Sequence, residues 1–138
     1  MITAQEFEQA CVCQALRRAA RSVSRRYETA LRPVGLKAGQ FSILAGLQRE
    51  RAVPLGELAR VLGLDRTTLT RDLQPLVRRE LVASSGGEDR RVRLLELTEA
   101  GRELLRAAEP LWREAQAASR AAVPEAAWTD VRKQLDQL

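Results

Sequence analysis

The sequence predicts a mainly α-helical protein of one domain with one small β-hairpin. Leu and Ala carry most of the apolar character, and aromatic residues make up only 4% of the 138 residues, a balance that favours helices over sheets. Apolar side chains recur at spacings of three and four along most of the chain, which is the period of an amphipathic helix. Residues 81–97 instead combine two short apolar runs with a Ser- and Gly-rich turn, the pattern of a hairpin.

The first long helix is expected over residues 3–31. Its apolar stripe is formed by Cys13, Leu16, Ala20, Val23, Tyr27 and Leu31. A basic ridge lies beside that stripe, formed by Arg17, Arg21 and Arg25. The helix should end before Pro33, because a proline disfavours helical backbone in the residue before it.

Three shorter helices are expected next. The first covers residues 38–48, and the second begins near Pro54 and stops at Gly63, in keeping with proline at a first turn. Asp65 can cap the third helix through a backbone N–H of the following turn. The buried face of that third helix is predicted as Leu69, Leu73, Leu76 and Val77. Pro75 removes one backbone hydrogen bond inside the helix and should bend it.

The hairpin and the C-terminal helices complete the chain. Strands are expected over residues 81–83 and 91–97, joined by a turn over residues 84–89. Thr98 can cap a long helix that reaches about residue 122, which Pro110 should kink. A last helix follows Pro124.

This order of elements describes a winged helix-turn-helix flanked by N- and C-terminal dimerisation helices. We predict a single domain over residues 1–138, with the winged lobe at about 38–98 and the dimerisation helices at about 3–32 and 99–138. The terminal helices carry apolar stripes that need a partner, and a second copy of the chain is the simplest one.

Several kinds of chemistry lack the residues they need. The chain has no His and only two Cys, so it offers no His general base, no Ser-His-Asp triad and no metal site. We therefore expect no enzyme activity, no cofactor and no metal. No apolar run approaches membrane-spanning length, and residues 1–10 carry two Glu and no basic residue, unlike a signal peptide. A cytoplasmic protein with no membrane partner is the simplest expectation.

The charge balance favours a polyanionic partner only weakly. The net charge is +5, and residues 14–37 hold seven basic residues against one acidic residue. Many basic proteins bind no nucleic acid, so the placement of the charges carries more information than their sum.

The predicted second helix of the helix-turn-helix carries side chains suited to DNA. Thr hydroxyls and methyls can meet phosphates and thymine methyls, and Arg can pair with guanine or phosphate. The candidate contacts on this helix are Arg66, Thr67, Thr68, Thr70 and Arg71. The alternative is a solvated, well-capped surface helix, which the helix-turn-helix context disfavours.

The hairpin adds a second set of candidates. An Arg at a flexible tip can enter a narrow minor groove, where the negative potential attracts guanidinium. The candidates are Arg90, Arg91 and Arg93. Asp89 could hold the Arg91 side chain by a charge-assisted hydrogen bond.

Residues 54–101 resemble the core of the MarR family (multiple-antibiotic-resistance regulators). The resemblance rests on the helix-turn-helix, on the wing tip Asp89-Arg90-Arg91 and on Leu97-Thr98-Glu99-Ala100-Gly101, the family's Leu-Thr-x-x-Gly. Helix order and chain length extend it to essentially the whole chain. It implies a homodimeric winged-helix transcription regulator, usually a repressor, whose first and last helices form the dimer interface. It also implies that Arg91 is the minor-groove residue.

Cys13 has two interpretations. It lies on the apolar stripe and could be a small buried residue, but Arg side chains follow it, and nearby cations favour the oxidisable thiolate. The segment from Val12 also resembles the first helix of the organic-hydroperoxide-sensing branch, in which tyrosines bond the sensing Cys. Tyr27 matches one of them and could approach Cys13 only from the other subunit, while Arg17 and Ala38 occupy the other tyrosine positions. A disulfide from Cys11 would strain a continuous helix.

The basic ridge also has more than one interpretation. It could be a solvated face, contact DNA phosphates, or line the family's usual ligand cleft, where Arg17 and Arg21 would attract a small anionic or aromatic effector. The favoured function is a homodimeric, sequence-specific DNA-binding transcription regulator, a repressor released by a small ligand or by oxidation. Its partner would be double-stranded DNA with a pseudo-palindromic operator. The alternative is a winged-helix protein-interaction or architectural module without a specific operator.

Overall fold

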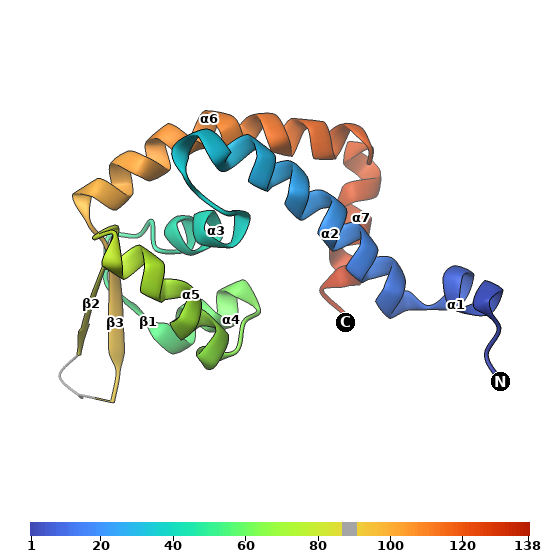
Figure 1. The fold of residues 1–138 in the computed structure, drawn as a ribbon, viewed down its shortest axis with the longest axis horizontal. Helices are drawn as coiled ribbons and strands as arrows, with labels where there is room; N and C mark the ends of the chain where they lie inside the picture. Colours follow the sequence, from blue (N-terminus) through green and yellow to red (C-terminus); the bar gives the residue numbers. More distant parts are fainter. Residues whose placement is uncertain (87–90) are drawn as a thin grey trace.

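The computed structural model describes residues 1–86 and 91–138, and it confirms a mainly helical winged fold (Figure 1). A lobe contains three helices, α3 (Ala38–Gly46), α4 (Leu55–Leu62) and α5 (Arg66–Arg78), and three strands, β1 (Val53–Pro54), β2 (Val82–Gly86) and β3 (Arg93–Leu97). An arm extends from the lobe. It contains α1 (Ala4–Ala10), α2 (Val12–Leu31), the short 3-10 helix η1 (Arg32–Val34), α6 (Glu99–Ala121) and α7 (Glu125–Leu135).

The core of the lobe is almost entirely aliphatic. Its fully buried large side chains come from all three helices and from the sheet, and they include Ile43, Leu44, Leu58, Leu69, Leu73, Leu76 and Leu95. No polar or charged residue of the described part of the chain is buried. The predicted buried face of α5 is therefore confirmed for Leu69, Leu73 and Leu76, whereas Val77 is half-buried at the edge of the core. The opposite face of α5 remains available to solvent.

The turn between α4 and α5 depends on Gly63. Its backbone is left-handed, with φ +64°, and its N–H closes the C-terminus of α4 on the Arg60 carbonyl. A residue without Cβ adopts that conformation with little strain. The sharp turn then delivers Asp65 to the start of α5.

The wing is a three-stranded antiparallel sheet in the order β1-β3-β2. A hairpin was predicted here, but its bounds differ: β2 continues through residues 84–86, which were predicted as turn, and β3 begins at Arg93 instead of Arg91. In the observed register Val82 lies opposite Leu97 and Gly86 opposite Arg93. The two-residue strand β1, which adds Val53 opposite Leu95, was not predicted. A strand that short carries no alternation for a sequence pattern to reveal.

The N-terminal helix differs from the prediction. The expected single helix over residues 3–31 is divided at Cys11, which has an extended backbone (φ −76°, ψ 102°). Thr3 and Glu6 cap the start of α1 reciprocally, and the Cys11 thiol accepts the backbone N–H of Gln14 at 3.5 Å. Each piece thus has its own N-terminal cap, which satisfies donors that a continuous helix would bond internally.

The two internal prolines interrupt neither helix. Pro75 lies within α5 and Pro110 within α6, and each helix continues past its proline. Figure 1 shows α6 as a long, curved helix over the top of the lobe, with α2 beside it. Gentle curvature accommodates the lost backbone hydrogen bond without ending the helix.

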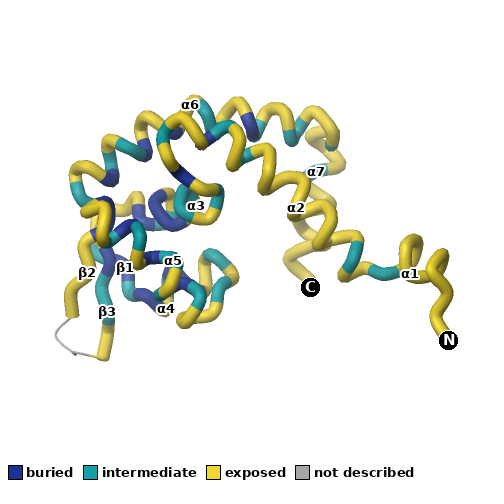
Figure 2. Tube along the Cα trace, viewed as in Figure 1, coloured by how far each residue is buried: buried dark blue, intermediate teal, exposed yellow. Residues whose placement is uncertain are grey.

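The far part of the arm is poorly buried in a single chain (Figure 2). Helices α1 and α7 have no buried residue, and α2 buries only Leu31 at its lobe end. Large apolar side chains of the arm remain exposed, among them Phe7, Val12, Leu16, Val23, Val131 and Leu135. Within the described residues, no helix has the length and apolarity that crossing a membrane requires.

Candidate nucleic-acid interface

The N-terminus of α5 is fixed by a side-chain cap. The Asp65 carboxylate accepts hydrogen bonds from the Thr68 hydroxyl at 2.7 Å and from the Thr68 backbone N–H at 2.8 Å. These two bonds lower the pKa of Asp65, the hydroxyl bond most strongly, because they stabilise the ionised form. The cap satisfies a free helix donor and so determines where α5 begins.

A hollow of about 470 Å³ lies between α5, the start of α4 and β3. One wall is the exposed face of α5, with side chains at spacings of three and four: Thr67, Thr70, Arg71 and Gln74. Residues so spaced share one face of a helix. Leu55, Arg66 and Arg93 complete the lining.

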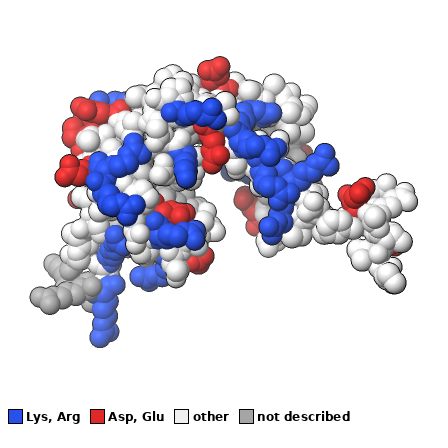
Figure 3. Space-filling view, viewed as in Figure 1, with Lys and Arg blue, Asp and Glu red and all other residues white. Residues whose placement is uncertain are grey.

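Three guanidinium groups surround this hollow. Arg71 pairs with its neighbour Asp72 at 3.3 Å, a contact between two solvent-exposed groups. Arg66 makes no hydrogen bond or ion pair with any other residue of the described chain. Figure 3 shows Lys and Arg side chains over the lobe and in a column along the wing. The hollow is therefore a positively charged surface with hydroxyl and amide groups at its centre.

Arg93 connects the wing to α5. Its Nε donates a hydrogen bond of 2.6 Å to the Ser84 hydroxyl on the adjacent strand, and its side chain also lines the hollow beside α5. The wing and α5 thus present one continuous surface. Arg91 is exposed just before β3, whereas Asp89 and Arg90 lie outside the described residues, so the predicted hold of Asp89 on Arg91 does too.

The structure brings together most of the residues that the sequence predicted for DNA. The hollow collects Arg66, Thr67, Thr70, Arg71 and Arg93. Thr68 lies outside it, with its hydroxyl bonded to Asp65. Leu55 and Gln74 belong to the hollow but were not predicted. Gln74 could have been found from its spacing, since it follows Thr70 by four residues.

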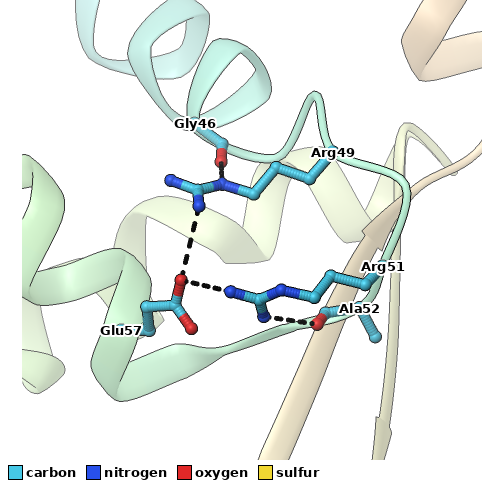
Figure 4. A network of polar contacts seen from close by, with 5 residues as sticks. All are labelled: Gly46, Arg49, Arg51, Ala52 and Glu57. Carbon is cyan, nitrogen blue, oxygen red and sulfur yellow. Dashed lines mark hydrogen bonds and ion pairs between the residues drawn. The ribbon is translucent and has the colours of Figure 1, made fainter.

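A cluster of two arginines and one carboxylate ties the loop after α3 to α4 (Figure 4). Glu57 accepts Arg51 at 2.7 Å and Arg49 at 3.4 Å, and Arg49 also donates to the Gly46 carbonyl. The bond from Arg51 lowers the pKa of Glu57. This network holds the loop after α3 against the first turn of α4. The two ion pairs explain Glu57 as a structural carboxylate.

The two cysteines are free thiols near the start of the arm. Cys13 is exposed and Cys11 is half-buried, so the packing role considered for Cys13 is not realised within one chain. The strain expected for a bond between them assumed a continuous helix, and the extended backbone of Cys11 removes that assumption. The Tyr27 hydroxyl donates to the Gln116 side chain of the same chain.

A second cavity, of about 310 Å³, lies between α3 and α6. Phe41 and Trp112 both line it, and their rings stack on each other with centroids 5.8 Å apart and planes 15° from parallel. Arg106 and Glu109 contribute the charges of its lining. Arg17 and Arg21, predicted as ligand residues, do not line this cavity.

Known proteins match this chain in fold and in sequence. The family model described as MarR family matches residues 36–92. The M. tuberculosis transcriptional regulator MosR, solved in complex with DNA, is 42% identical, with 92% of each chain covered and a TM-score of 0.84. No curated protein sequence matches significantly.

Two more distant structures share the fold. One is BpsR of Bordetella bronchiseptica, whose DNA binding is regulated by 6-hydroxynicotinic acid. It is 25% identical over 93% of this chain and 92% of its own, with a TM-score of 0.82. A mutant MarR from E. coli in complex with operator DNA is 20% identical over 98% of both chains, with a TM-score of 0.85, a likeness of fold alone. Because the chain is 42% identical to MosR and matches the family model, it belongs to the MarR family. It is a DNA-binding transcription regulator, not an enzyme.

Proposed function

We propose that this protein is a cytoplasmic, homodimeric repressor that binds a pseudo-palindromic operator and leaves it when it meets a small effector or an oxidant. As predicted from the sequence, the winged lobe at about residues 38–98 carries the DNA contacts and the helices at about 3–32 and 99–138 carry dimerisation. The proposed contacts are Arg66, Thr67, Thr68, Thr70, Arg71, Arg90, Arg91 and Arg93.

The observation that carries the DNA contacts is the basic hollow between α5 and the wing. Its hydroxyl and amide side chains come from the exposed face of one helix, and its cations come from α5 and β3. A helix in the major groove presents base-reading groups in this way, while Arg side chains on either side bind phosphates. In this proposal, Arg91 before β3 meets the adjacent minor groove.

The test is a fluorescence-anisotropy titration of the reduced protein on DNA from its own upstream region, with excess nonspecific duplex. We expect saturable binding that weakens steeply with salt, because each phosphate contact releases counterions. The double variant Arg90→Ala with Arg91→Ala should bind more weakly and still fold. If no duplex, including those from in vitro selection, is bound specifically, the result would favour the protein-interaction module instead.

Dimerisation is supported by the arm. Its apolar side chains at Phe7, Leu16 and Val23 are exposed in the single chain, and an isologous pairing of two arms would remove them from water. Two lobes held by paired arms would present two α5 helices to half-sites about one helical turn apart.

The cavity between α3 and α6 supports an aromatic, anionic effector. The stacked rings of Phe41 and Trp112 give this cavity an apolar, aromatic wall, and Arg106, which also lines it, can meet a carboxylate. Arg17 and Arg21 remain part of this proposal as cations of the arm that attract the anion. Benzoate should quench the fluorescence of Trp112. The quench should vanish in Trp112→Phe and persist in Trp128→Phe, whereas equal loss in both variants would contradict the site.

Oxidative release is supported by the exposed Cys13 thiol near the basic ridge. Its thiolate would attack an organic hydroperoxide, break the O–O bond, release the alcohol and become a sulfenic acid. Tyr27 is proposed to approach this group from the other subunit. Treated wild-type protein should lose operator DNA and regain it after thiol. Cys13→Ser should not respond, and a response that survives in this variant but fails in Cys11→Ser would move the role to Cys11.

A further inference from the structure

The feature that carries a further inference is Gln74, the side chain nearest the C-terminus of α5 among those that line the basic hollow, and one that the sequence did not predict. Gln74 follows Thr70 by four residues and Thr67 by seven, so all three lie on the same exposed face. The side chain is exposed. It precedes Pro75, after which α5 continues only to Arg78. Gln74 is thus the last polar group that α5 contributes to this surface.

The Gln74 amide is available for a ligand. It makes no hydrogen bond to any other residue within 1–86 and 91–138. Two of the cations that line the hollow are already engaged, since Arg71 pairs with Asp72 and Arg93 donates to Ser84. An amide offers a donor and an acceptor side by side, which matches the N7 acceptor and N6 donor of adenine in the major groove.

We infer that Gln74 reads an adenine in each half-site of the operator and is a specificity-determining residue of this regulator. Four residues of helix span about 6 Å, and stacked base pairs are about 3.4 Å apart. With α5 along the groove, Gln74 faces a base pair about two steps from the one that Thr70 faces. The surrounding Arg66, Arg71 and Arg93 hold the backbone on either side. This inference rests on the proposed binding of a specific operator.

The experiment is in vitro selection from a randomised duplex library with wild-type protein, Gln74→Ala and Gln74→Glu. Gln48→Ala, an exposed glutamine just after α3, is the matched control. Wild-type and control should select the same motif, with adenine at one position of each half-site. Gln74→Ala should lose the preference at that position alone and bind the wild-type site about tenfold more weakly. Gln74→Glu should shift the preference toward cytosine, whose N4 amino group donates to a carboxylate.

The outcomes separate this inference from the proposed function. A wild-type motif that Gln74→Ala selects unchanged at every position overturns the role of Gln74 and leaves sequence-specific binding intact. Failure of the wild-type protein to select any motif overturns both. Thermal unfolding and affinity for nonspecific duplex, measured for each variant, establish that an altered motif arises from base reading and not from loss of fold.

Discussion

Gly101 has almost no room for a side chain. It lies in the first turn of α6, where its N–H donates to the Thr98 hydroxyl at 3.0 Å. The same hydroxyl donates to the Glu80 carbonyl at 2.7 Å. A Cβ on Gly101 would lie 2.1 Å from the Leu81 carbonyl oxygen. The Leu-Thr-x-x-Gly motif is thereby explained by a close backbone approach between the start of α6 and Leu81, in the segment that joins α5 to β2.

Gly101→Ala should destabilise the fold by about 1–3 kcal/mol, the usual cost of overpacking, because the clashing atom belongs to the backbone. Urea unfolding followed by circular dichroism measures the change. Gly39→Ala is the control, since a Cβ there meets nothing within 4 Å and should be neutral or stabilising in a helix. Equal stability of the two variants would contradict this close approach.

A second prediction concerns how the contribution of Asp65 to stability depends on pH. Its pKa is lowered in the folded protein by the bonds from Thr68. Its contribution to stability is therefore complete above the unfolded-state pKa of about 3.9, and it is lost as the pH falls through the lower folded-state pKa. Asp65→Asn keeps an N-cap but does not titrate, so the stability difference between wild type and this variant should shrink on acidification. A difference that stays constant from neutral pH down to the acid limit of folding would exclude this coupling.

Among the elements, the helices with a clear apolar period and the hairpin could be predicted, whereas the division of the N-terminal helix and the strand β1 could not. The lobe helices α3, α4 and α5 follow apolar periodicity and cap signals, and all three were predicted. The break at Cys11 was missed because apolar spacing continues across it, while the interruption depends on local caps by Thr3 and the Cys11 thiol. The strand β1 exists only through its pairing with β3, which is a tertiary effect.

The candidate site follows the same logic. Residues near the start of α5 were predicted because a capped helix after a tight turn exposes its first side chains. Gln74 and Leu55 were not, since only the packing of α4 and β3 against α5 determines how far the hollow extends. The bond between Arg93 and Ser84 also required the strand register, which the sequence pattern does not determine.

Because Arg93 lies where the wing meets α5, we predict the effect of Arg93→Ala. Loss of this cation should weaken binding to all sequences about equally and reduce the salt slope by about one for each bound copy. Ser84→Ala should give a smaller loss, because it frees Arg93 without removing its charge. Anisotropy titrations at several salt concentrations measure both. Arg113→Ala, whose side chain pairs with Glu109 on α6, should leave affinity nearly unchanged.

The whole molecule consists of one lobe and one arm. The arm buries few apolar side chains by itself, because α1 and α7 have no buried residue and α2 buries only Leu31. Sedimentation should give twice the chain mass of 15.4 kDa. Leu16→Asp should shift the protein toward monomer and reduce operator affinity, because a charge in a paired apolar face is poorly solvated. Val61→Asp, at a similarly exposed apolar position on α4, should remain dimeric. A dimeric Leu16→Asp would remove α2 from the interface.

The cations of the basic hollow between α5 and the wing are all guanidinium groups, and the chain has no histidine. Arginine stays protonated at every pH a cell reaches, so the attraction of this surface for DNA cannot be switched off by a proton. In the proposed dimer, a signal received in the arm therefore has to act on the spacing or tilt of the two lobes, because the charge of these arginines stays the same.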